Sequence, residues 1–338
     1  MNHSPLDITI IFTSYGSFRP LNYFFFTLTF IFYLLSVLSN ILLMLVIYFE
    51  SSLHKPMYIF LFNLAVNGLI GSSAIWPKVM ENLLSDTQKS SLLACLVQVF
   101  WSYFYISSAY TTFSVMAYDR YISICKPLLY HSIMTPRKVK ALLTAANIIP
   151  LSSISIQVYL TSTLPMCGYT IHNLFCDNLE LLKLSCVKSA LVSLYGVCMI
   201  TILIGFPCII VLLSYAKILT VSLKASKDAR KKALSTCSPH LITFINLSLA
   251  SLFVDIYHRY SSVLPGNACI VMIIDIFVIP PLLHPIIYGI RTQEIRKCFV
   301  KTVRKKERFF RIYSAFSLTM KFRLRSGPIN VLFNDKIN

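Results

Sequence analysis

Long apolar stretches, almost free of charged side chains, recur along the sequence. They run over residues 20–49, 56–77, 90–118, 141–161, 189–216, 233–254 and 260–290, and the last is interrupted by one acidic residue, Asp275. About 20 apolar helical residues cross a hydrocarbon core roughly 30 Å thick, and lipid requires backbone polar groups to be satisfied internally. The pattern therefore predicts an all-α membrane protein, a bundle of seven transmembrane helices with its termini on opposite sides.

The composition supports this interpretation. Of the 338 residues, 56% are hydrophobic and 13% are charged, and the mean hydropathy is +0.68. A soluble domain carries about 25% charged residues, and surface helices of a soluble fold show a charged face. The composition excludes an ordinary soluble protein and a disordered one.

The net charge of +18 is compatible with nucleic-acid binding, with anionic lipid, or with charges that set membrane topology. If the amino terminus is outside, 25 of the 31 Lys and Arg residues fall in the loops and tail of the inner side. The positive-inside rule therefore predicts that the amino terminus of this multi-pass protein is extracellular, and we expect the membrane to be the plasma membrane. No nucleic-acid partner is needed to explain the charge.

The same map predicts three regions. An extracellular arm covers residues 1–22, the seven-transmembrane domain covers 23–290, and a basic cytoplasmic helix and tail covers 291–338. The sequon at Asn2 predicts glycosylation of the arm. Basic residues interleaved with Ile295 and Phe299 predict a short interfacial eighth helix that contacts membrane lipid.

Five sequence motifs follow one another along the chain. They are LHKPMY at 53–58, MAYDRYISICKPLLY at 116–130, SYAKIL at 214–219, KALSTCSPHL at 232–241 and PPLLHPIIY at 280–288. This series resembles the olfactory receptors of the rhodopsin-like G-protein-coupled receptor superfamily, and the residues at 66–69 and 238–240 are similar to those of fish-type members. The resemblance implies an odorant receptor, not an enzyme, that needs no cofactor or metal and activates a heterotrimeric G protein of the olfactory type.

The resemblance also implies which residues couple to the G protein. These are Asp119, Arg120, Tyr121, Tyr215, Pro285 and Tyr288. Asp119 would hold Arg120 in the inactive state, and the hydroxyls of Tyr215 and Tyr288 would lie near Arg120 through water. In the simpler interpretation, these residues are topology charges and interfacial aromatics.

The resemblance places the ligand site among the outer halves of helices three, five, six and seven. The candidates are Tyr103, Ile106, Ser107, Tyr110, Leu247, Ser248 and Asp275. The first four share a helical face, which could instead pack against a neighbouring helix. Leu247 and Ser248 replace an aromatic pair of most family members. Asp275, an intramembrane carboxylate, meets either a ligand or Arg259.

Four cysteines fall on the predicted outer side, where disulfides form: Cys95, Cys167, Cys176 and Cys186. Sequence alone allows three pairings. The resemblance implies that Cys95 is bonded to Cys176 and Cys167 to Cys186.

Two other interpretations remain open at this stage. A non-olfactory rhodopsin-like receptor for a peptide or amine would share the fold, whereas a transporter or channel is expected to show repeats or several intramembrane charges. A receptor that no longer signals is a further possibility, because Gly68, His284 and Ser248 depart from the family pattern.

Overall fold

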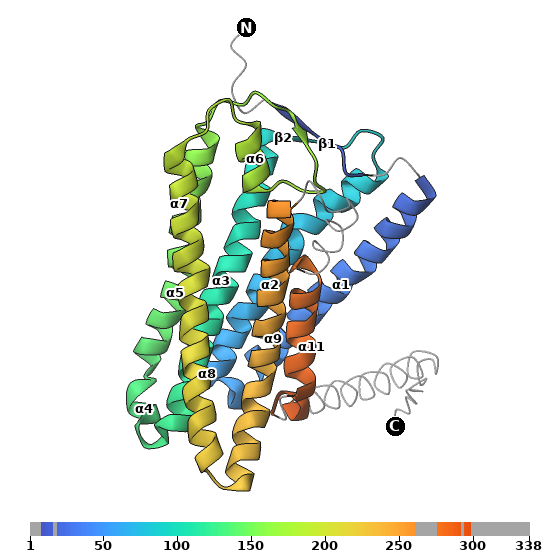
Figure 1. Ribbon diagram of the computed structural model, residues 1–338. Coiled ribbons are helices and arrows are strands. Elements are labelled where there is room, and N and C mark those ends of the chain that lie inside the picture. Colours follow the sequence, from blue (N-terminus) through green and yellow to red (C-terminus); the bar gives the residue numbers. More distant parts are fainter. Residues whose placement is uncertain (1–7, 16–18, 261–275, 292–293, 299–338) are drawn as a thin grey trace, which may run out of the picture.

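A computed structural model describes residues 8–15, 19–260, 276–291 and 294–298, which form a bundle of long helices with a small sheet at one end (Figure 1). Six helical segments in this part of the chain are long and apolar enough to cross a membrane. The seventh crossing is represented by residues 276–291. The predicted seven-transmembrane fold is confirmed, and the chain is a multi-pass membrane protein. We call the end with the sheet the cap end and the other the Arg120 end.

The helices are arranged in chain order as α1 to α11. The segments that form the crossings are α1 (Arg19–Phe49), α2 (Pro56–Leu84), α3 (Leu92–Cys125), α5 (Pro136–Ser162), α7 (Ala190–Ile200), the π-helical η4 (Thr201–Gly205), α8 (Phe206–Lys224), α9 (Lys227–Tyr260) and α11 (Ile279–Arg291). Of these, α7, η4 and α8 follow one another without a break and form the fifth crossing. The short ones are η2 (Ser51–Leu53), η3 (Pro127–Leu129), α4 (Tyr130–Ile133) and α6 (Asn178–Leu184). Residues 294–298 are helical, and the rest of the predicted eighth helix lies outside the described residues.

Several helices run further than the charge-free stretches that predicted them. The second continues past Pro77 to Leu84, and Lys78 and Glu81 form an ion pair of 2.8 Å on its last turns. Helix α5 starts before its apolar stretch, at Pro136, where the Thr135 side chain accepts a hydrogen bond from the backbone of Lys138. Charged residues mark the membrane boundary, whereas capping groups and backbone geometry decide where a helix begins.

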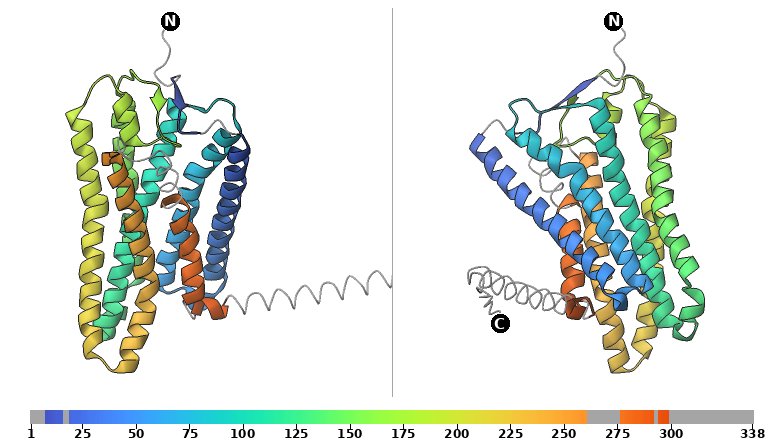
Figure 2. Two further views of the ribbon diagram at one scale, coloured as in Figure 1. Left: turned by 45° about the vertical axis from the view of Figure 1, so that its right-hand side comes forward. Right: turned by 180° about the vertical axis from the view of Figure 1, so that it is seen from behind.

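Helix α3 forms the centre of the bundle and contacts α2, α5, α8 and α9, while α1 packs along α2 at one edge (Figure 2). In the most apolar part of α3, 61% of residues are buried, against 17% for the span Ala190–Lys224. The exposed leucine, isoleucine and phenylalanine side chains of the outer helices therefore face lipid, where they cost nothing.

The fifth crossing contains the π-helical turn η4 between α7 and α8. Pro207 lies just after it, at the start of α8. Proline has no backbone N–H, and its ring clashes with the carbonyl four residues earlier. The helical turn before Pro207 therefore contains one extra residue, as in a π-helix.

Three prolines in the seventh crossing leave backbone carbonyls without their helical donors, and side chains from other helices supply the missing hydrogen bonds. The carbonyl of Ile276, four residues before Pro280, accepts a bond of 3.2 Å from the Tyr105 hydroxyl of α3. The carbonyl of Phe277, before Pro281, accepts one of 3.0 Å from Trp76 Nε1 of α2.

The third carbonyl, that of Pro281, is freed by Pro285 and accepts a bond of 2.8 Å from Asn40 Nδ2 of α1. All three donor side chains are buried. The seventh crossing is thus fixed to α1, α2 and α3 through positions that its own prolines created.

Gly71→Ala is expected to lower the free energy of unfolding by about 1 to 3 kcal/mol, the usual cost of overpacking. A Cβ atom at Gly71 would lie 2.5 Å from the Tyr105 ring, which would have to move away from its bond to Ile276. Gly289→Ala is the matched control, because a Cβ there meets nothing within 4 Å. Thermal unfolding in detergent measures both, and equal stabilities would contradict the prediction.

The sheet at the cap end was not predicted from the sequence. Strand β1 (Thr9–Phe12) lies between β2 (Lys89–Ser91), to which it is antiparallel, and β3 (Thr170–Ile171), to which it is parallel. Thr9 pairs with Ser91, and Phe12 pairs with Ile171. The amino-terminal arm therefore joins two loops that are far apart in the sequence.

Candidate functional site

A cavity of 340 Å³ lies near the cap end of the bundle. Its walls come from five helices, from η4, from the loop before α6 and from the start of the seventh crossing. The lining residues are Ser102, Tyr103, Ile106, Ser107, Gln157, Asn173, Phe175, Asp177, Asn178, Leu179, Leu182, Val192, Ser193, Gly196, Val197, Met199, Ile200, Leu203, Ile204, Ser251, Ile276 and Phe277. A cavity of about 150 Å³ holds benzene, so this one has room for a molecule roughly twice that size.

Three of the predicted ligand residues, Tyr103, Ile106 and Ser107, line this cavity. Tyr110, Leu247 and Ser248 do not. Tyr110 is buried one turn further along α3, where its ring packs edge-on against Phe244 at 6.1 Å. Leu247 is completely buried in the core. Asp275 and Asn2 lie outside the described residues.

The loop that carries the predicted disulfides covers the cavity. Disulfides join Cys95 to Cys176 and Cys167 to Cys186, the pairing that the resemblance implied. The backbone N–H of Cys176 donates to Gln98 Oε1 at 2.8 Å. The loop is therefore fixed to α3 by a covalent bond and by a buried hydrogen bond.

The cavity surface is mostly apolar, although nine of the 22 lining residues have a polar side chain. Asp177, next to the disulfide, accepts a hydrogen bond of 3.0 Å from the Tyr103 hydroxyl and one of 2.9 Å from the backbone of Leu179. Gln157 of α5 and Ser251 of α9 also line the cavity. Sequence reasoning missed these two, although a glutamine in an otherwise apolar span is a visible signal.

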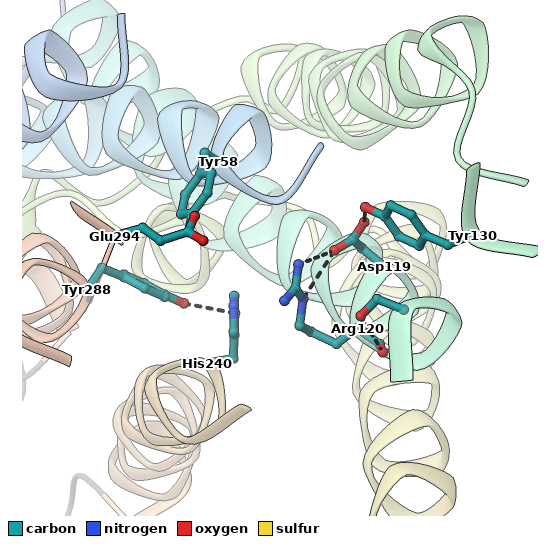
Figure 3. Close-up of polar contacts among 8 residues, drawn as sticks. Tyr58, Asp119, Arg120, Tyr130, His240, Tyr288 and Glu294 are labelled. Atoms are coloured by element: carbon teal, nitrogen blue, oxygen red, sulfur yellow. Dashed lines mark hydrogen bonds and ion pairs between the residues drawn. The ribbon is translucent and has the colours of Figure 1, made fainter. Parts of the chain in front are cut away.

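Three of the predicted coupling residues, Asp119, Arg120 and Tyr288, lie at the Arg120 end with their polar neighbours, as Figure 3 shows. Arg120 donates to Asp119 Oδ2 from Nε at 3.1 Å and from Nη2 at 2.7 Å. Tyr130, in α4, donates to Asp119 Oδ1 at 2.8 Å. Burial, and then the charge of Asp119, raises the pKa of Tyr130, so its hydroxyl remains a donor at neutral pH. Both oxygens of a fully buried carboxylate are satisfied.

The expected approach of the Tyr288 and Tyr215 hydroxyls to Arg120 through water stays a prediction, and the direct contacts of the two hydroxyls differ from each other. The Tyr288 hydroxyl lies 2.9 Å from His240 Nδ1 and 3.3 Å from Thr243 Oγ1, both on α9. The buried Tyr215 hydroxyl has no hydrogen-bond partner among the described residues. The seventh and sixth crossings are therefore joined through His240, which sequence reasoning had not selected.

The coupling roles of Tyr121 and Pro285 stay predictions, and the structure describes only their surroundings. Tyr121 follows Arg120 on α3 and is partly buried against the main core. Pro285 leaves the Pro281 carbonyl without its helical donor, and Asn40 Nδ2 donates a hydrogen bond to this carbonyl.

A second polar cluster at this end joins α2 to residues 294–298. Tyr58 donates to Glu294 Oε2 at 2.7 Å, and Lys55 Nζ lies 3.1 Å from the same oxygen. The bond from Tyr58, followed by the bond and charge of Lys55, lowers the pKa of Glu294 against the opposing effect of burial. Glu294 is therefore ionised at neutral pH and connects the start of the predicted eighth helix to α2.

Glu294→Gln is expected to lower the free energy of unfolding by about 1 kcal/mol at neutral pH, because the pair with Lys55 is exposed and one charge-assisted bond is lost. A carboxyl whose pKa is lowered on folding stabilises the protein above its unfolded pKa, about 4.3. That contribution disappears as pH falls through the folded pKa. Thermal unfolding of wild type and variant should differ at neutral pH and converge in acid. A difference that grows in acid would contradict the assignment.

Comparison with known proteins places the chain among one set of relatives. It matches the family model described as olfactory receptor over residues 28–306. It is 35% identical over 328 residues to olfactory receptor 5K3 of Homo sapiens, and the aligned region covers 94% of this chain and 97% of the relative. It is 35% identical over 294 residues to human olfactory receptor 4E1, covering 84% and 89%. For olfactory receptor 8B8 of Mus musculus the identity is 33% over 274 residues, covering 80% and 88%.

Proposed function

The chain belongs to the olfactory receptor family and is a chemosensory G-protein-coupled receptor, and from this premise we propose which parts of it meet the odorant and the G protein. The family excludes the enzyme, transporter and non-olfactory interpretations. We assign odorant binding to the cap-end cavity and G-protein binding to the Arg120 end. The G protein is of the olfactory type.

The observation that carries this proposal is the cavity itself. It has a volume within the range of small-molecule sites, it is lined mainly by apolar side chains, and a disulfide-bonded loop covers it. This mostly apolar surface indicates a ligand that is small and largely apolar. Tyr103, Ile106 and Ser107 are proposed ligand contacts, and Asp275 retains the role proposed from the sequence.

The two ends of the receptor are connected through the seventh crossing. Ile276 and Phe277 line the cavity, and Tyr288 on the same segment contacts His240 of α9. A ligand that displaces Phe277 would therefore shift the segment that holds α9 at the Arg120 end. We propose that this movement separates Arg120 from Asp119 and opens a site for the G protein, with Tyr121, Tyr215 and Pro285 adjusting around it.

The orientation follows from the positions of the charges. The Lys and Arg residues of the inner loops lie at the Arg120 end, so this end faces the cytoplasm and the amino terminus faces outward at the plasma membrane. The basic segment after residue 290 contacts anionic lipid, and Asn2 carries the glycan.

A cyclic-AMP assay of surface-expressed receptor against a panel of volatile odorants tests the proposal. We expect a saturable response to at least one neutral volatile that fits the cavity. Ile106→Trp should reduce that response at equal surface level, because the larger ring fills the cavity. A response that Ile106→Trp leaves unchanged would place the ligand elsewhere.

A further inference from the structure

Gln157 is a buried side chain whose hydrogen-bonding capacity is unused in the part of the chain that the structure describes. It projects from α5, the fourth crossing, and only 3% of it is exposed. Neither Nε2 nor Oε1 has a hydrogen-bond partner among the described residues. A buried polar group without a partner is costly, and most such groups in native proteins are paired.

The same side chain lines the proposed odorant cavity. The terminal torsion of glutamine is soft, so its amide can turn toward a molecule in the cavity without leaving a preferred conformation. A ligand with matching groups would supply the hydrogen bonds that the described residues do not. The unpaired amide is therefore explained if its partner arrives with the ligand.

Space for such a ligand is kept open beside the amide by Gly196 of α7. Gly196 also lines the cavity, and a Cβ atom there would lie 3.8 Å from Gln157 Oε1. That distance is an ordinary contact, so alanine would fit, whereas a longer side chain would occupy the space in front of the amide. The glycine and the glutamine thus form two sides of one polar subsite.

The chemistry of this subsite selects a class of ligand. A carboxamide offers one acceptor and two donors, so its best complement is a neutral group that presents a donor and an acceptor together. Primary amides and lactams have this arrangement. A carboxylate lacks a donor, and the Asp177 side chain on the same cavity wall would repel its negative charge.

We infer that Gln157 determines ligand specificity by forming paired hydrogen bonds to a neutral amide-type odorant in this cavity. The inference rests on the proposed function, because it names the polar end of the ligand that the cavity accepts. It also adds the fourth crossing to the binding site.

Four probes with one carbon skeleton test the inference in the cyclic-AMP assay: phenylacetamide, phenylacetaldehyde, phenylacetate and phenethylamine. Wild-type receptor is expected to respond best to phenylacetamide. Gln157→Met keeps the length of the side chain and removes the amide. Two ordinary hydrogen bonds correspond to about a thirtyfold change in potency, so the variant should lose roughly that factor for the amide and little for the aldehyde.

Two variants serve as controls. Ser155→Ala removes an exposed hydroxyl on the same helix, which donates a hydrogen bond to the Leu151 carbonyl, and it should leave every potency unchanged. Gly196→Val fills the space beside the amide and should reduce the phenylacetamide response, whereas Gly196→Ala should not. Equal losses for amide and aldehyde in Gln157→Met would overturn the inference.

A ligand-free measurement separates failure of the inference from failure of the proposed function. If Gln157 is unpaired in the empty receptor, Gln157→Met should unfold at the same temperature as wild type or higher. A clear drop would show that the amide has a structural partner and would overturn the inference. A receptor that answers other odorants but not phenylacetamide would also overturn it, whereas silence toward the whole volatile panel would overturn the proposed function and the inference with it.

Discussion

Replacing Arg120 with alanine is expected to abolish odorant-stimulated cyclic-AMP production, to the level of cells without the receptor. Arg120 is the charged group at the end of α3 that is held by Asp119 through two hydrogen bonds and is 15% exposed. It therefore reaches the surface at the Arg120 end, where the proposed mechanism releases it by a shift of the neighbouring helices. Its loss removes the proposed G-protein contact but leaves the cavity, at the opposite end, intact.

Ligand binding and surface level decide whether this expectation holds. Odorant should still raise the unfolding temperature of the purified Arg120→Ala protein, because binding to the folded state stabilises it. Lys140→Ala is the matched control, since it removes an exposed positive charge from the same end of the bundle. Normal signalling by Arg120→Ala at equal surface level would refute the role assigned to Arg120.

Cys95→Ser or Cys176→Ser is expected to cost about 2 to 5 kcal/mol of stability and most surface expression. The bond closes a loop across a sequence separation of 81 residues and fixes the covering loop to α3. Both cysteines are buried, so a lone partner thiol would also remain in a core built around the bond.

The double variant sharpens this test. Because the two cysteines act as one bond, Cys95→Ser combined with Cys176→Ser should be no worse than either single change. Cys198→Ser, at an exposed free cysteine of α7, should be neutral. Additive losses in the double variant would mean that the two residues stabilise the protein separately.

The sequence by itself predicted the number of crossings and their approximate limits, and its charge pattern carries the proposed orientation. The cost of placing a side chain in lipid adds up locally along the chain, so a charge-free stretch predicts a crossing without knowledge of its neighbours. The series of motifs, read as a resemblance, also located Asp119 and Arg120 and implied the two disulfide pairs. These features depend on residues that are close in sequence or on patterns that a family shares.

The tertiary structure decided which side chains meet. A helix that is apolar on all sides gives no signal for the face that it turns inward. The sequence therefore did not show that Gln157 and Ser251 line the cavity, or that Tyr110 and Leu247 do not. Likewise, the Tyr288 hydroxyl lies 2.9 Å from His240 Nδ1 of α9, a partner that the sequence did not indicate. The partners of the proline-freed carbonyls lie on three other helices, up to 241 residues away. Such contacts depend on the rotation and register of each helix, which only packing of the complete bundle fixes.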